Sequence, residues 1–303
     1  MHNEKYLKQA ELLLRILPNV AREEVFALKG GTAINFFWRD FPRLSVDIDL
    51  TYVKVEAREL SLTNISTRLA SIEGRIQRIF PQINIAKKKI EENIIGLIIN
   101  TRDSVVKIEV NPVVRGTVYP TVNKKLSHKV EQQFELALSV NTLSFEDLYG
   151  SKICAALDRQ HPRDLFDIKL LFDNEGLTEK IRKAFIVYLI SHNRPMVELL
   201  NPGIQELKPI FENEFSGMTT EEIKLSDLVE TRIELIRKIK ASLTEDEIRF
   251  LLSFKNKKPQ WDLLGIDSIK DLPGVKYKLI NINRMNPEKH NEAYNKLRDY
   301  LLS

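Results

Sequence analysis

Apolar residues recur along the chain with two different periods, and the change between them falls near residue 140. Val46, Ile48 and Leu50 alternate with polar residues, which is the period of a half-buried strand. From residue 144 onward, apolar residues recur every three or four positions, the spacing of one buried helix face. We therefore expect a mixed α/β domain at residues 1–140 and a mostly helical domain at residues 141–303.

Individual elements follow from the same patterns and from their terminating residues. A helix is expected at 4–17, where Pro18 should end it. Strands are expected at 25–28, 46–53, 83–88, 93–100 and 104–111, and the last two should form a hairpin. The stretch after Pro112 is expected to be irregular. Further helices are expected at 32–38, 60–80, 144–159, 162–173, 177–191, 219–239, 244–254 and 287–302.

Composition excludes several classes of protein. The 303 residues are 43% hydrophobic and 29% charged, which rules out a disordered or fibrous chain. One cysteine cannot form a disulfide framework. The longest apolar run, Ile94–Ile99, is far shorter than the roughly 20 residues that cross a bilayer. We expect a soluble protein of a reducing compartment, most simply the cytoplasm, with no membrane partner.

The positive charge of the chain is concentrated at its C-terminal end. The formal net charge is +4, and residues 251–303 carry ten Lys or Arg against six Asp or Glu, which accounts for the whole excess. A basic end beside a neutral body fits a surface that faces a polyanion. A solvated lysine-rich face is the commoner alternative.

Gly30 and Gly31 lie where the strand 25–28 gives way to the next helix. Glycines let backbone N–H groups approach a ligand closely, and a helix N-terminus favours an anion there. Thr32 could add a hydroxyl contact to that anion or cap the helix. An ordinary strand–helix turn is the alternative to a phosphate site.

Asp47 and Asp49 lie two residues apart on the alternating strand, so their carboxylates project from one face. Two parallel carboxylates suit Mg²⁺, which prefers oxygen ligands and substrate phosphates. Glu109 lies on the polar side of strand 104–111 and could supply a third ligand to a two-metal site. A solvent-facing Glu109 beside Lys107 is the alternative.

Lys152, Asp164 and Asp167 occupy two successive predicted helices. The two acids fall on the apolar face of the second helix, and an acid on a packing face needs a partner. Either Lys152 reaches a triphosphate and Asp167 orients it, or Lys152, Arg159 or Arg163 neutralises the acids structurally.

In this order and spacing, these motifs resemble the AbiEii/AbiGii-type toxins of the nucleotidyltransferase superfamily, whose fold is like that of polymerase β. The glycine pair followed by Asp47-Ile48-Asp49 resembles the first motif of the family, and the stretches 152–159 and 162–167 resemble its later Lys and Asp motifs. The resemblance covers residues 25–175. It implies an α+β fold, with a nucleotidyltransferase-type mixed-sheet core followed by a mostly helical C-terminal domain.

The resemblance also implies an activity and a set of residue roles. It implies a Mg²⁺-dependent enzyme that moves NMP from an NTP to an acceptor such as the 3′ end of tRNA. Such an enzyme would act as a growth-inhibiting toxin in a toxin–antitoxin or phage-defence system, with a cognate antitoxin protein as partner. Asp47, Asp49, Lys152 and Asp167 would be catalytic, Asp47 and Asp49 would bind metal with Glu109 added by strand position, and Gly30, Gly31, Thr32, Ser45, Lys152 and Asp164 would bind nucleotide.

Ser45 lies two residues before Asp47 and hence on the same side of an extended strand. A phosphate on its hydroxyl would place negative charge beside the metal-binding acids, whereas a plain strand serine is the alternative. For the whole chain, two other functions stay open: nucleotidylation of a protein or small-molecule hydroxyl, and an inactive module that binds nucleotide or a partner.

Overall fold

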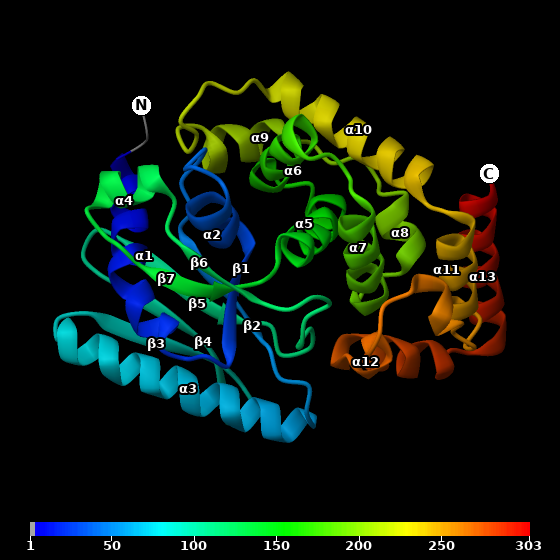
Figure 1. Cartoon of the computed structure of the whole chain (residues 1–303), viewed down its shortest axis with the longest axis horizontal. Coiled ribbons are helices and arrows are strands. Elements are labelled where there is room, and N and C mark those ends of the chain that lie inside the picture. The colour runs from blue at the N-terminus through cyan, green and yellow to red at the C-terminus, as the bar shows by residue number, and fades with distance from the viewer. Residues whose placement is uncertain (1–3) are drawn as a thin grey trace. The chain divides into compact units, whose positions relative to one another are not determined.

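The structure, a computed structural model, describes residues 4–303 and divides them into two compact units (Figure 1). Unit 1 contains the described residues up to Leu148 together with Asn213–Ile223. Unit 2 contains Tyr149–Glu212 and Lys224–Ser303. Within the described part of the chain, no helix is both long and apolar enough to span a bilayer.

Unit 1 is built on a seven-stranded mixed sheet with the strand order β3-β4-β5-β2-β1-β7-β6. Strand β2 is central and pairs in parallel with β5 and antiparallel with β1. Its neighbours therefore flank both edges of the segment that carries Asp47 and Asp49. The strands are β1 (Phe26–Lys29), β2 (Asp47–Tyr52), β3 (Asn84–Ile90), β4 (Asn93–Asn100), β5 (Val105–Val110), β6 (Val122–Lys125) and β7 (Ser139–Thr142).

The five strands predicted from the alternation of apolar residues are confirmed, and β4 and β5 form the expected antiparallel hairpin. The prediction of an irregular stretch after Pro112 is wrong in part, because β6, helix α4 (His128–Phe134) and β7 lie there. Each of these two strands has only four residues, and both are rich in polar side chains. Their hydrogen bonds to β1 and to each other, rather than local hydrophobicity, define them.

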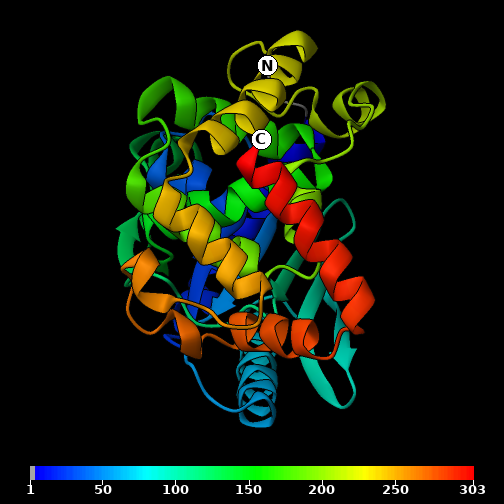
Figure 2. The ribbon, with the colours of Figure 1, turned by 90° about the vertical axis from the view of Figure 1, so that its right-hand side faces the viewer.

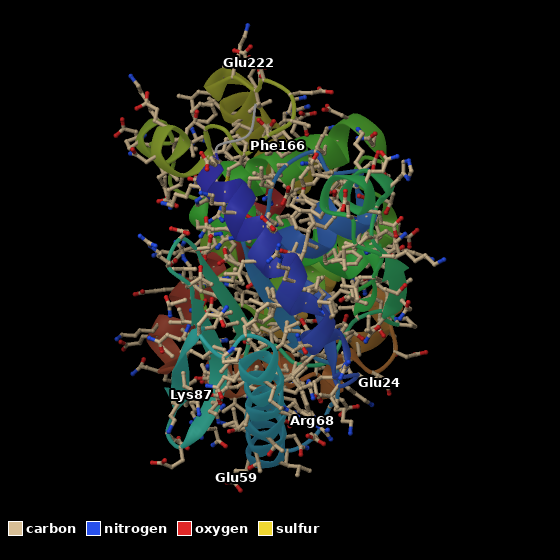
Figure 3. All side chains as sticks on the ribbon, turned by 90° about the vertical axis from the view of Figure 1, so that its left-hand side faces the viewer. Glu24, Glu59, Arg68, Lys87, Phe166 and Glu222 are labelled. Carbon is tan, nitrogen blue, oxygen red and sulfur yellow. The ribbon has the colours of Figure 1, made fainter. Side chains whose placement is uncertain are left out.

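Helices α1 (Glu4–Ala21) and α3 (Arg58–Ile79) contact each other as well as the sheet (Figure 3). The expected end of α1 at Pro18 is wrong, because the helix continues to Ala21. Pro18 has no N–H to donate to the carbonyl oxygen of Leu14, but the residues after it stay helical. Burial of Asn19 and Val20 holds the last turn in place.

The regular elements described in unit 2 are helices. This confirms the helical C-terminal half that was expected from the spacing of apolar residues. Figure 2 shows α11 beside α13, and His290 of α13 forms a hydrogen bond with the backbone oxygen of Lys255 at the end of α11. Helix α10 begins at Leu225, six residues later than predicted, because the preceding segment belongs to unit 1, where Thr219 pairs with Arg43. The helices longer than eight residues are α5 (Phe145–Arg159, shared with unit 1), α6 (Pro162–Asn174), α7 (Glu179–Ser191), α10 (Leu225–Ser242), α11 (Glu245–Lys255), α12 (Pro273–Asn283) and α13 (Pro287–Leu302).

Candidate functional site

The glycine pair forms the turn between β1 and the short helix α2 (Gly30–Ala33), which continues as the π-helical turn η1 (Ile34–Trp38). Gly30 has a φ of +69°, in the left-handed region. A Cβ atom at Gly30 would lie 2.5 Å from Asp49 Oδ2, and one at Gly31 would lie 2.7 Å from Arg43 Nη2. Gly30 therefore favours glycine through its backbone conformation as well as through its contact with Asp49, whereas a side chain at Gly31 would require the Arg43 guanidinium to move.

Asp47 and Asp49 project from the same face of β2, and both are half-buried. Between and beyond them, Ile48 and Leu50 are buried on the opposite face. The register of β1 and β2 places Lys29 opposite Asp49, so the start of the glycine turn lies beside the two acids. Within residues 4–303, no hydrogen bond or ion pair engages the Asp49 carboxylate. Its oxygens are thus available to a ligand.

Glu109 lies next to Asp49, because the parallel register of β2 and β5 pairs these two residues. Side chains at paired positions of a sheet point to the same face, so the predicted neighbourhood of the two acids is present. The Glu109 carboxylate is nevertheless engaged: Lys88 Nζ of β3 lies 2.7 Å from its Oε1. As a metal ligand, Glu109 would have to exchange this ion pair for the cation.

Thr32 and Ser45 lie behind the acids rather than beside them. Thr32 is fully buried, and its hydroxyl donates to the backbone oxygen of Asp47 at 2.6 Å. The same hydroxyl lies 2.9 Å from Ser45 Oγ, and Ser45 is 6% exposed. In this arrangement the two hydroxyls fix the start of β2 relative to α2. A phosphate could reach them only after the surrounding residues moved.

Arg43 is a residue of this site that the sequence pattern did not single out. It is buried, and its Nη1 donates to the backbone oxygen of Leu44 at 2.9 Å. A buried guanidinium against the glycine turn adds positive charge close to the expected phosphate position. In the sequence, only its position between the glycine pair and the acids could have indicated that Arg43 belongs to this site, since arginines are common in loops.

Unit 2 brings Lys152, Asp164 and Asp167 together as predicted from the helical spacing. Lys152 Nζ lies 2.8 Å from Asp164 Oδ1 and 3.1 Å from Asp167 Oδ2, and all three side chains are buried. Arg159 Nε donates to Asp164 Oδ2 at 2.5 Å. Two cations and two carboxylates thus neutralise one another, which agrees with the alternative that Lys152 and Arg159 serve only to neutralise the buried acids. Lys152 has three donors and spends two on these acids, so one remains for a phosphate oxygen.

The electrostatics of the cluster hold its charges in place. Burial by itself would raise the pKa of Asp164, but attraction to the Lys152 ammonium and the hydrogen bond from Arg159 hold that pKa well below its usual range. Asp164 therefore stays ionised at neutral pH. Cys154, on the same helix as Lys152, lies in the core of unit 2, and burial raises the pKa of its thiol. An un-ionised, buried thiol is not a nucleophile.

The residues of unit 1 fit a Mg²⁺ ion bound through two carboxylates. Within the part of the chain that the structure describes, no group of three or more His, Cys, Asp or Glu side chains is arranged to hold a metal. Mg²⁺ is commonly bound through one or two carboxylates, with substrate phosphates completing the coordination. Asp47 and Asp49 supply such a pair beside a glycine turn.

Comparison with known proteins also points to a nucleotidyltransferase. The family model described as the nucleotidyl transferase AbiEii toxin of a type IV toxin–antitoxin system matches residues 11–266. The solved structure of the nucleotidyltransferase toxin MenT4 from Mycobacterium tuberculosis H37Rv aligns over 97% of this chain and 92% of its own. Its TM-score of 0.55 at 14% identity shows a shared fold. The expected α+β nucleotidyltransferase-type fold is thereby confirmed.

Two further comparisons add little. Terminal uridylyl transferase 4 from Trypanosoma brucei with bound dUTP aligns over 99% of both chains at 11% identity, but its TM-score of 0.30 is too low to support an argument. Among curated proteins, no sequence matches this chain.

Proposed function

Because the chain belongs to the AbiEii family of nucleotidyltransferase toxins, we propose that this enzyme transfers NMP from an NTP to the 3′ hydroxyl of an RNA. The acceptor end of tRNA is the proposed target, and blocking it would inhibit growth. The observation that carries the proposal is the packing of Gly30 against Asp49, which puts the glycine turn, the proposed phosphate site, next to two carboxylates on one strand face. Regulation by a cognate antitoxin and a part in phage defence belong to the same proposal.

In the proposed reaction, the acceptor hydroxyl gives its proton to solvent water, and its oxygen forms a bond to the α-phosphorus of the NTP. The bond from the α-phosphorus to the oxygen that bridges to the β-phosphate breaks, and pyrophosphate leaves with that electron pair. Asp47 and Asp49 would hold Mg²⁺, which supplies charge neutralisation at the phosphates and lowers the pKa of the acceptor hydroxyl. The backbone N–H groups at Gly30 and Gly31 would orient the phosphates.

The remaining residues of the proposed site act by positioning. Lys152 would contact the triphosphate through its third donor, while Asp164 and Asp167 fix the direction of its ammonium group. Thr32 and Ser45 would support the nucleotide site indirectly, through the bonds that hold Asp47 in place. Glu109 is proposed as an additional metal ligand that trades Lys88 for the cation.

A transfer assay tests the proposal. Purified protein is incubated with total tRNA, Mg²⁺ and each α-³²P-labelled NTP in turn. Label should appear on tRNA with the wild type and with Asp103→Asn, an exposed control in the β4–β5 loop, and should be lost with Asp47→Asn and Asp49→Asn. Full activity of either of the last two would exclude these carboxylates as the metal ligands.

Three further results separate the alternatives. If Glu109→Gln keeps full activity, Glu109 is not a ligand and Asp47 and Asp49 suffice. If tRNA stays unlabelled while NTP binding depends on Mg²⁺ and on Asp49, the acceptor is a protein or small-molecule hydroxyl. Absence of any NTP binding would leave a partner-binding module of the same fold.

A further inference from the structure

Unit 2 contains a cavity of about 200 Å³, lined by none of the residues that the sequence analysis assigned to nucleotidyl transfer. Segment 193–197, the end of helix α11 and helices α12 and α13 contribute its wall. The wall is mostly apolar, with Met196, Ile282, Met285 and Leu297 among its side chains. A dry cavity of about 150 Å³ is large enough for a benzene ring, so this one has room for a small organic molecule.

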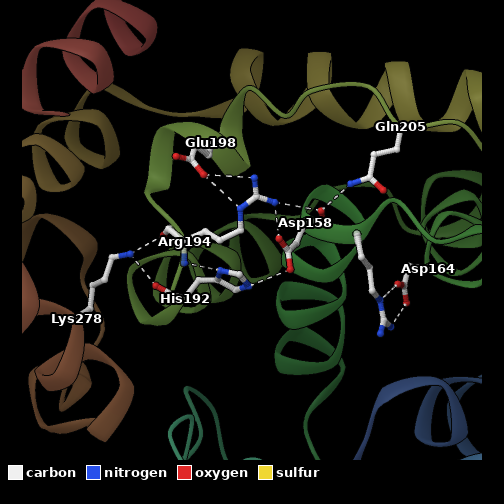
Figure 4. Close-up of polar contacts among 8 residues, drawn as sticks. Asp158, Asp164, His192, Arg194, Glu198, Gln205 and Lys278 are labelled. Atoms are coloured by element: carbon white, nitrogen blue, oxygen red, sulfur yellow. Dashed lines mark hydrogen bonds and ion pairs between the residues drawn. The ribbon is translucent and has the colours of Figure 1, made fainter. Parts of the chain in front are cut away.

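Two lysines line this apolar cavity, and both are buried. Lys255 is 8% exposed and Lys278 is 9% exposed. Lys278 Nζ donates to the backbone oxygens of His192 at 2.7 Å and Arg194 at 2.5 Å (Figure 4). Lys255 Nζ contacts only the thioether sulfur of Met285, at 3.6 Å, among the described residues. Among the described residues, neither ammonium group therefore donates a hydrogen bond to a carboxylate oxygen.

Among the described residues, neither buried lysine has a carboxylate as an ion-pair partner. Within residues 4–303, no carboxylate lies within ion-pair distance of either lysine; the nearby Glu198 is paired with Arg194, which also binds Asp158 (Figure 4). Burial, together with repulsion by Lys255 and against the attraction of Glu198, lowers the pKa of Lys278 to about 8, and burial lowers that of Lys255. Two buried cations that lack an ion-pair partner beside an apolar cavity are costly, and an anion would offset that cost.

We propose that this cavity binds a small amphiphilic anion, whose carboxylate or phosphate contacts Lys255 and Lys278 and whose apolar body, about one ring in size, lies against Met196 and Met285. The charge of the lysines selects the anionic group, and the apolar wall selects the body. The site lies within unit 2 and uses none of the residues assigned to nucleotidyl transfer, so it stands or falls separately from that activity.

The methionines provide a direct readout of binding. Of the four methionines of the chain, Met196 and Met285 line the cavity, and Met218 lies in unit 1 and serves as an internal reference. The full chain, labelled with [methyl-¹³C]methionine, is titrated with benzoate, phenyl phosphate and neutral benzamide. Benzoate or phenyl phosphate should shift the Met196 and Met285 signals saturably and leave Met218 unchanged. Benzamide should bind at least about tenfold more weakly, since it cannot form a charge-assisted bond.

Substitution of one lysine tests the role of the charge. Lys255→Met keeps the length of the side chain and removes the ammonium group, so benzoate affinity should fall about tenfold or more while the weak benzamide affinity is kept. Lys255 is preferred to Lys278 because Lys278 also binds two backbone oxygens and its loss could unfold the region. Lys276→Met, on the same helix as Lys278 but exposed and paired with Asp271, is the matched control.

The outcomes are distinct. Preference for benzoate or for phenyl phosphate identifies the anionic group and supports the site. Equal binding of benzoate and benzamide, shifts that do not saturate, shifts at Met218 as well, or a folded Lys255→Met variant with unchanged benzoate affinity would each overturn the proposal.

Discussion

Residue 30 is subject to two separate constraints, one from its backbone and one from its neighbour. A φ of +69° strains any side chain, and the carboxylate of Asp49 occupies the place of a Cβ atom. Gly74 of helix α3 is the opposite case, because nothing lies within 4 Å of the Cβ it lacks. Gly30 and Gly74 should therefore respond to substitution by alanine in opposite directions.

Gly30→Ala should lower the free energy of unfolding by about 1–3 kcal/mol and reduce nucleotide transfer further, because Asp49 must move. Gly74→Ala should instead stabilise the protein by about 1 kcal/mol, since alanine favours a helix interior, with no change in transfer. Urea denaturation and the transfer assay measure both. A Gly30→Ala variant as active as the wild type would show that the close packing against Asp49 is not required.

The second residue-scale case is Asp164, whose pKa is depressed by its bonds to Lys152 and Arg159 once burial is overcome. A carboxylate whose pKa is lowered on folding stabilises the folded state at pH values above its unfolded pKa, about 3.9 for Asp. That stabilisation is lost as the pH falls from the unfolded pKa through the folded pKa. Asp164→Asn should cost about 3–5 kcal/mol at pH 7, since it leaves Lys152 buried with one partner fewer. The difference from wild type should narrow below pH about 4.

Chemical denaturation between pH 3 and 7 measures this effect. Asp173→Asn is the control, because Asp173 lies on the same helix in an exposed pair with Lys169. A difference between Asp164→Asn and wild type that stays constant down to pH 3 would contradict the assignment of the shifted pKa.

At the scale of elements, helix α11 is fixed to α7 by one side chain. Glu247 accepts from Thr244 N–H in a capping box, and Arg182 of α7 donates to both of its carboxylate oxygens, at 2.8 and 2.9 Å. Glu247 is 1% exposed. A single carboxylate thus satisfies the helix start and orients two helices.

Glu247→Ala should therefore lower the free energy of unfolding by about 2–4 kcal/mol, because it removes the cap and leaves the Arg182 guanidinium, which is only 14% exposed, without its partner. Asp246→Ala, next to it in an exposed pair with Arg249, should change stability little. Thermal and urea unfolding compare the two. Equal effects of the two substitutions would show that the buried pair does not hold the helices.

The elements also show which features a sequence can predict. Helix α13 was predicted to the residue, because Pro287 marks its start and its apolar spacing is regular. The glycine turn and the acids of β2 were predicted because local geometry fixes them. Strands β6 and β7, helix α12, Arg43 at the glycine turn and Lys88 at Glu109 were not, since each depends on contacts between distant parts of the chain.

At the scale of the whole molecule, the charge excess of residues 251–303 is less available to a polyanion than the sequence suggests. Lys255 and Lys278 are buried in the cavity of unit 2, and Lys276 and Arg298 are paired with acids. Exposed cations remain on and near helix α13, among them Lys289 and Lys296. Among the described residues, six of the ten cations of this segment are thus neither buried in the cavity nor paired with an acid, which limits the number of phosphates that this end of the chain can contact.

Affinity for tRNA should depend on salt in proportion to the number of phosphates that are contacted. With about three phosphate contacts, a fourfold rise in salt lowers the affinity by roughly 30-fold, because each contact releases a condensed counterion. The double variant Lys289→Gln, Lys296→Gln should flatten the slope of log K against log salt by about 2, whereas Lys8→Gln on α1 should leave it unchanged. Fluorescence anisotropy with labelled tRNA measures the slopes. If wild-type binding does not change with salt, the acceptor is not held through its phosphates, and a protein or small-molecule acceptor becomes the better explanation for the same catalytic residues.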